Sequence, residues 1–298
     1  MALLPDRVYT NSGWFDDLAD SQSWFSKGLV TTSVPLAVLS AAATSTTNNA
    51  SAYTSDSFTP TQGDLLVVVS GITATAVSPT CTTGSNGITF TRVVDQAWSA
   101  SAHRHNIFVA NQLVPASPTA MTVSIDVTGD NGTGGNISVL RVQGMQRTGT
   151  AAVRQATAFT NVVGTGGAYD MSFPAATLSS NIVIATLANN TNPATITPPT
   201  GFIEICDIGY DTPSAGLEVC YDLTGGYTTR TWGSISATVG TANGIELDTS
   251  APPSLAYPDV VVGGVKKTVA NAWIVVGGSK KSVVEMSVIV GGVKKPLP

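Results

Sequence analysis

The 298-residue sequence predicts an all-β protein: an internally duplicated jelly roll or β-sandwich with an extended N-terminal arm and C-terminal β-hairpin repeats. Short runs rich in Val, Ile and Thr recur along the chain between clusters of Gly, Pro, Asn and Ser, which is typical of strands joined by turns. Only residues 14–25 have a pattern that suits a short helix. Five sequence blocks between residues 34 and 250 occur twice in the same order, which indicates the duplication.

The N-terminal arm, residues 1–33, is marked by an unusual concentration of aromatic side chains. Trp14, Phe15, Trp24 and Phe25 fall within twelve positions, and the sequence between them is polar and acidic. Large aromatic residues are enriched among the anchors of protein interfaces. We therefore expect these four residues to dock the arm onto another protein. The alternative is an arm that folds back onto its own sandwich.

The middle region, residues 34–250, divides into halves at about 34–145 and 146–250. The separation between matched residues falls only from 117 to 107 positions along the region. A unit of about 215 residues is acceptable as one all-β domain, so we favour a single large sandwich over two smaller ones. The matched blocks begin at Ser57 and Ser172, Phe90 and Phe202, Val109 and Val219, Thr122 and Trp232, and Asn136 and Asn243.

The C-terminal region, residues 251–298, contains one short motif three times with a 14-residue period. Each copy places three β-branched residues before Gly-Gly and a lysine pair after it, as in the segment 260–267. Two glycines supply the positive φ angles of a two-residue hairpin turn. A single hairpin of this size is marginal in water, so we expect contacts between copies, most simply in a trimer. The residues predicted to make these contacts are Val261, Gly263, Gly264, Val275, Gly277, Gly278, Ile289, Gly291 and Gly292.

Charge is distributed unevenly between the body and the C-terminal region. Residues 1–258 contain 8 basic and 17 acidic residues, whereas residues 259–298 contain 6 basic and 2 acidic ones. An acidic body argues against nucleic-acid binding by the whole chain. The lysine pairs either keep exposed strand edges soluble or pair with the acidic body of a neighbouring copy.

The sequence predicts neither an enzyme nor a cofactor site. Catalytic, phosphate-binding and metal-binding motifs are not found, and His103 and His105 are interpreted as exposed strand residues rather than half of a metal site. Cys81, Cys206 and Cys220 fit no Cys-x-x-Cys pattern and are expected to be small, reduced side chains. Apolar runs reach only five residues and no secretory signal is apparent, so no membrane association is expected.

The repeated Val-Gly-Gly-x-Lys-Lys segments resemble repeats near the C-termini of minor tail proteins and fibres of tailed bacteriophages. In this sequence Lys266, Lys280 and Lys294 stand where that pattern often has tryptophan. The Ser/Thr-rich middle region is similar to jelly rolls of phage virion proteins. These resemblances imply a structural protein of a virion that is assembled in the host cytoplasm and contacts other virion proteins of the tail or capsid.

The expected function is therefore that of a tail-associated structural component, with a head decoration protein as the alternative. A second class is an adhesin that binds a host receptor or glycan. Such a protein needs an aromatic platform on the loops of the sandwich. The aromatic residues available for it are Trp98, Tyr210, Tyr221, Tyr227 and Trp232.

Overall fold

The computed structural model describes two compact units of the chain, residues 1–250 and residues 251–298. In the first unit the described residues are 36–99, 102–161, 167–190, 196–212, 214–235 and 239–250. In the second unit they are the backbones of six short strands. The prediction of an all-β protein is confirmed, since antiparallel sheets make up both units apart from one 3-10 turn at Gly149–Ala152. No helix among the described residues is long and apolar enough to span a membrane.

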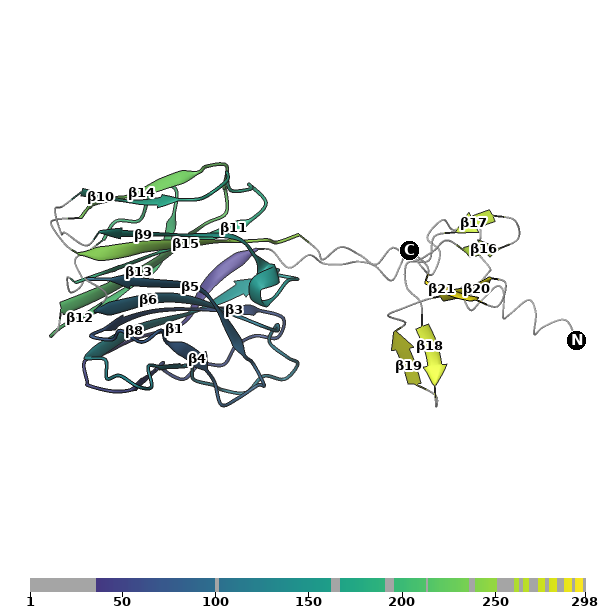
Figure 1. Ribbon diagram of the computed structural model, residues 1–298, viewed down its shortest axis with the longest axis horizontal. Helices are drawn as coiled ribbons and strands as arrows, with labels where there is room; N and C mark the ends of the chain where they lie inside the picture. The colour runs from purple at the N-terminus through teal and green to yellow at the C-terminus, as the bar shows by residue number, and fades with distance from the viewer. Residues whose placement is uncertain are drawn as a thin grey trace, which may run out of the picture. The chain divides into compact units, whose positions relative to one another are not determined.

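Two large sheets form the centre of the first unit (Figure 1). The first large sheet has the order β1-β8-β3-β6-β5 and the second has the order β9-β15-β11-β13-β12. Their strands are β1 (Ala37–Thr46), β3 (Leu65–Thr73), β5 (Phe90–Trp98), β6 (His103–Ala110) and β8 (Gly134–Gln143), and then β9 (Val153–Asn161), β11 (Ile182–Asn189), β12 (Ile203–Asp211), β13 (Ser214–Asp222) and β15 (Gly240–Leu247).

A small sheet covers the outer face of each large one, so that the unit has four layers (Figure 1). The first small sheet has the order β2-β7-β4 and the second pairs β10 with β14. Their strands are β2 (Ala52–Thr54), β4 (Thr80–Thr82), β7 (Ser124–Asp126), β10 (Gly167–Ser172) and β14 (Thr229–Ile235). Both halves belong to one compact unit, and the preference for one large sandwich over two smaller ones stays a prediction. The finer prediction of jelly-roll connections stays a prediction.

The strands of the two large sheets correspond one to one: the order β1-β8-β3-β6-β5 of the first half matches the order β9-β15-β11-β13-β12 of the second. Even an irregularity is repeated: β5 has a bulge between Arg92 and Val94, and β12 has one between Glu204 and Cys206. These bulges fall at the same place in the sequence blocks that begin at Phe90 and Phe202. The duplication seen in the sequence therefore corresponds to a repeated arrangement of strands.

The structure moves one of the sequence matches by two residues. Counted from the bulge, Val94 pairs with Ile107 in the first half and Cys206 pairs with Val219 in the second. Ile107, rather than Val109, therefore occupies the position of Val219. A shift of two keeps every side chain on its original face of the sheet, so the apolar pattern alone does not distinguish the two alignments.

The central strands β3 and β11 are buried along their whole length, which explains their continuous apolar sequences. In β11, Ile182 and Ile184 contribute to the core that includes the first large sheet. Val183 and Ala185 point the other way, into a second core with Trp232 beneath the second small sheet. Each side of the strand thus has its own layer to pack against.

The two large sheets approach closely where their residues are small. A Cβ atom placed on Gly71 would lie 3.6 Å from that of Ala188 in the facing sheet. Reciprocal hydrogen bonds also cross between the sheets. Asn136 of β8 donates through Nδ2 to the carbonyl of Ala215 in β13, and Asn243 of β15 donates to the carbonyl of His105 in β6, each at 3.4 Å. Matching strands therefore make similar contacts in both directions.

We predict that the two halves unfold together, because each large sheet buries one face against the other. Hydrogen exchange followed by mass spectrometry should give β3 and β11 opening free energies that agree within about 1 kcal/mol, close to the global value. An opening of β11 at a clearly lower free energy, with β3 still protected, would show that the halves are independent.

Candidate functional site

The residues predicted to dock the N-terminal arm, Trp14, Phe15, Trp24 and Phe25, lie outside the described residues. The same holds for the predicted contact residues Gly263, Gly264, Gly277, Gly278, Gly291 and Gly292. The other three predicted contacts, Val261, Val275 and Ile289, lie in strands of the C-terminal unit. The structure leaves their role in contacts between copies a prediction.

Three separate hairpins of the same register make up the described part of the C-terminal unit. In each one an apolar residue of the first strand lies opposite the first lysine of the pair: Val261 opposite Lys266, Val275 opposite Lys280, and Ile289 opposite Lys294. The paired strands are β16 (Val260–Val262) and β17 (Val265–Lys267), β18 (Trp273–Val276) and β19 (Ser279–Ser282), and β20 (Ser287–Val290) and β21 (Val293–Pro296).

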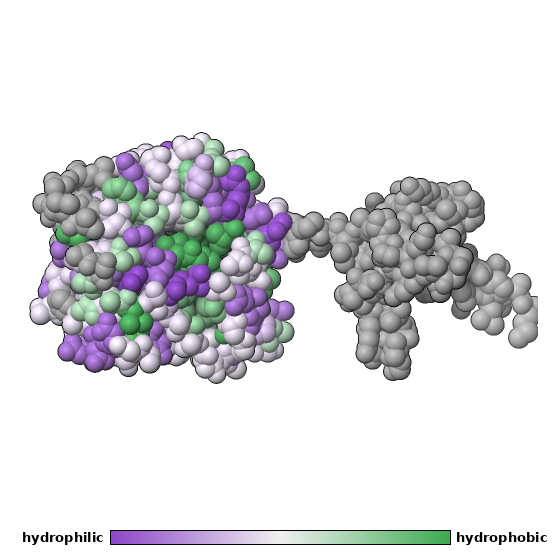
Figure 2. Space-filling model, viewed as in Figure 1, coloured by the Kyte–Doolittle hydropathy of each residue, from purple (hydrophilic) through white to green (hydrophobic). Residues whose placement is uncertain are grey.

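Four of the five aromatic residues available for the platform of the adhesin hypothesis are buried, and the fifth, Tyr221, is half-buried. Trp98 and Trp232 are 1% and 0% exposed, and Tyr210 and Tyr227 are also buried. Tyr210 is committed to the contact between the large sheets, where its hydroxyl lies 2.9 Å from Thr73 Oγ1. These rings fill the cores instead of facing solvent. The viewed face of the first unit mixes hydrophilic areas with a hydrophobic patch near its middle (Figure 2).

The interpretation of both histidines as exposed strand residues was wrong, because β6 runs through the centre of the unit. His105 is fully buried, its Nε2 lies 3.0 Å from Thr186 Oγ1, and burial lowers its pKa to about 3. His103 is half-buried, and its Nδ1 accepts a hydrogen bond from the Ala74 amide. Among the described residues, no group of three or more His, Cys, Asp or Glu side chains is placed to hold a metal ion.

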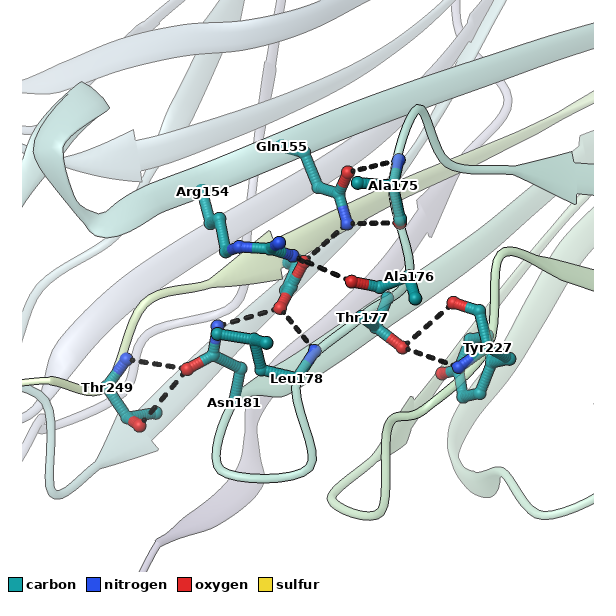
Figure 3. Close-up of polar contacts among 10 residues, drawn as sticks. Arg154, Gln155, Ala175, Ala176, Thr177, Leu178, Asn181, Tyr227 and Thr249 are labelled. Carbon is teal, nitrogen blue, oxygen red and sulfur yellow. Dashed lines mark hydrogen bonds and ion pairs between the residues drawn. The ribbon is translucent and has the colours of Figure 1, made fainter.

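One buried glutamate, Glu246 on β15, is fully enclosed by donors (Figure 3). Its Oε2 accepts hydrogen bonds from Arg154 and Gln155, and its Oε1 accepts them from the Leu178 amide at 2.8 Å and Asn181 at 2.7 Å. Arg154 is the unpaired residue of a bulge in β9, which directs its side chain to the carboxylate. This cluster fastens the segment before β11 to the sheet, so its role is structural.

The first half has a related polar contact at the matching place, with a base where the second half has Glu246. Asp64 directly precedes β3 as Asn181 directly precedes β11, and Asp64 forms an ion pair with Arg141 of β8 at 2.5 Å. Arg141 pairs with the second residue of β3, and Glu246 pairs with the second residue of β11. The residue that pairs with the second position of the central strand is therefore basic in the first half and acidic in the second.

A second buried glutamate, Glu218 on β13, has no such donors. It is 0% exposed, and within the described residues neither of its carboxyl oxygens has a hydrogen-bond partner. Asp207 of β12 lies directly opposite it, and the exposed Glu204 lies just before on the same edge strand. We call Glu204, Asp207 and Glu218 the acidic cluster. It is the candidate functional site, because buried carboxyl groups without partners are costly in a purely structural role.

The protonation of the acidic cluster follows from its surroundings. Burial raises the pKa of Glu218 to about 9, and the neighbouring carboxylates of Asp207 and Glu204 add to this rise. Burial also raises the pKa of Asp207, while a hydrogen bond from the Ile196 amide opposes that effect. Glu218 therefore holds its proton at neutral pH.

Comparisons with known proteins do not add a functional assignment. The sequence matches no protein-family model, and searches of curated proteins and of solved structures gave no match.

The acidic cluster was not predicted from the sequence, although Glu204 and Asp207 lie in one of the matched blocks. In that match Glu204 is aligned with Arg92, and Asp207 is aligned with Asp95. A change from a basic to an acidic residue within an otherwise similar block was the available signal. The burial of Glu218 could not be inferred from the segment itself.

We predict that replacing Glu218 by Gln stabilises the protein increasingly as the pH rises from about 5 to about 9. The folded state holds a proton in this range that the unfolded state releases from a carboxyl group with a pKa near 4.5, so rising pH favours unfolding of the wild type. The slope from one group is at most about 1.4 kcal/mol per pH unit. Urea unfolding at several pH values measures it, with Asp56→Asn as the exposed control. Parallel pH profiles for Glu218→Gln and the wild type would contradict the prediction.

We predict that replacing Glu246 by Ala lowers the free energy of unfolding by at least about 2 kcal/mol, because it leaves buried donors unpaired. Asp170→Ala removes an exposed carboxylate that bonds only the Thr231 hydroxyl, and it should change stability by at most about 0.5 kcal/mol. Chemical denaturation compares the two. Equal effects would mean that the hydrogen bonds around Glu246 contribute little.

Proposed function

We propose that the protein is a structural component of a phage virion, associated with the tail. In this proposal the N-terminal arm attaches the protein to the particle, the four-layered body projects from it, and the C-terminal hairpins join copies of the chain. The resemblance of the Gly-Gly-x-Lys repeats to those of minor tail proteins supports the assignment to a virion. A head decoration protein is the alternative, in which the same arm contacts the capsid.

The observation that carries the proposal is the form of the C-terminal unit. Each hairpin is a two-stranded sheet of its own, with strands of three or four residues. Hairpins of this length are marginally stable alone, and among the described residues their outer edges pair with no further strand. Open edges that carry β-branched residues favour association with another chain. Three equal hairpins in series would multiply such a contact within one oligomer.

Two deletions of the same protein test the two attachments separately. Ending the chain after Pro258 should leave a folded body of lower oligomeric order in light scattering, because the hairpins are lost. Deleting residues 1–33 should leave the oligomer intact but prevent the protein from entering particles, since the four aromatic anchors are lost. A full-length protein that is monomeric at micromolar concentration, or that keeps its oligomeric order without the hairpins, would contradict the proposal.

A further inference from the structure

The first half of the duplicated body contains three residues at the positions that correspond to the acidic cluster of the second half. The bulges of β5 and β12 align Arg92 with Glu204 and Asp95 with Asp207. Asn106 lies directly opposite Asp95, as Glu218 lies directly opposite Asp207. The same three positions therefore hold Arg, Asp and Asn in the first half but Glu, Asp and Glu in the second.

In the first half, arginine side chains form ion pairs with the acid at these positions. Asp95 lies 3.6 Å from Arg92 and 3.5 Å from Arg104, and it accepts a hydrogen bond from Ser78. The Arg92 guanidinium sits at the sheet edge, where its side chain is 33% exposed. A charged group at this position is thus reachable from solvent.

The second half has the same geometry without the cations. Among the described residues, no Arg or Lys forms an ion pair with Glu204, Asp207 or Glu218. Within the described residues, Oδ1 of Asp207 and both carboxyl oxygens of the wholly buried Glu218 have no hydrogen-bond partner, and neither has the amide group of the matching Asn106. Glu204 and Asp207 lie on the same strand and are both acidic. The cluster therefore lacks a positively charged group that the first half provides internally.

The described arginines of the first unit already have partners of their own. All six of its described arginines are engaged, five in ion pairs and Arg230 over the ring of Tyr227. Six of the seven lysines of the chain lie instead in the C-terminal repeats, as pairs with a 14-residue period. The strands that contain them, β17, β19 and β21, are short and have an open edge.

The acidic cluster also lies on an open edge. Within the described part of the chain, β12 is the last strand of its sheet and pairs only with β13. An open edge accepts an added strand through its backbone groups, while pockets for alternate side chains give such a contact its specificity. The sequence of β12 contains Glu204, Asp207 and Asp211 and no basic residue, which suits an incoming strand that is rich in lysine.

We propose that the acidic cluster, at the edge formed by β12, binds the lysine pairs of the C-terminal hairpins of a second copy of this chain. A lysine ammonium group takes the place that the Arg92 guanidinium occupies in the first half, and it pairs with Asp207 and Glu204. This proposal rests on the self-association proposed above and specifies where on the body the hairpins bind.

Carbodiimide cross-linking of the full-length protein tests the contact, because it joins an amine directly to a carboxylate. An equal mixture of ¹⁴N- and ¹⁵N-labelled protein is cross-linked and digested, and mass spectrometry then identifies the joined peptides. We expect peptides that contain Glu204 or Asp207 to be joined to those with the C-terminal lysine pairs, in mixed-isotope pairs. Links only within one copy, or none at β12 under conditions in which light scattering shows oligomers, would overturn the proposal.

A variant that copies the first half provides a second test. Glu204→Arg should let the second half neutralise Asp207 by itself, so that self-association weakens about tenfold and loses most of its salt dependence. Asp56→Arg makes the same charge change at another exposed position and should leave self-association within about twofold. Circular dichroism confirms that both variants are folded.

The two proposals fail in different ways. If Glu204→Arg associates as strongly as the wild type and with the same salt dependence, the site on β12 is wrong while self-association through the hairpins stands. If the full-length wild type is monomeric by light scattering, the self-association itself is wrong, and with it the binding of a second copy.

Discussion

The contact between the two large sheets determines how the rest of the body is built. Because β3 and β11 are covered on both faces, each needs an outer small sheet as well as the opposite large sheet. This requirement produces four layers, and it explains why polar groups in the middle are tied to the facing sheet. Asn136, Asn243 and Thr73 all form hydrogen bonds across the contact, which offsets the cost of burying them.

The two halves share this scaffold but differ in which of their carboxylates form ion pairs. At the start of the central strands both halves have neutralised their buried carboxylates, through Arg141 in one and through Arg154 with Asn181 in the other. At the edge strands only the first half has done so. The difference is local, because the strand order and the bulge are kept while Arg92 is replaced by an acid. Such a departure between equivalent places is more informative than either place considered alone.

The sequence was sufficient for the fold class and for the duplication, because both depend on periodic apolar runs and on turn residues. It was insufficient for the exact match of β6 with β13, since a shift of two residues preserves the faces of a strand. It also misplaced His105. The exposure of this side chain depends on which face of a strand another layer covers, and that is fixed by contacts distant in the chain. Glu218 was missed for the same reason.

The reciprocal packing of the halves has a further consequence for how their contact is maintained. Two equivalent sandwiches on separate chains would form this contact only above the dissociation constant of a dimer. Joined in one chain, they meet at an effective concentration set by the connecting segment, in the millimolar range for a short one. The contact then persists at any dilution of the protein. Sequence symmetry is no longer required on the two outward surfaces, so one half can keep its internal ion pair while the other gives its edge to an external partner.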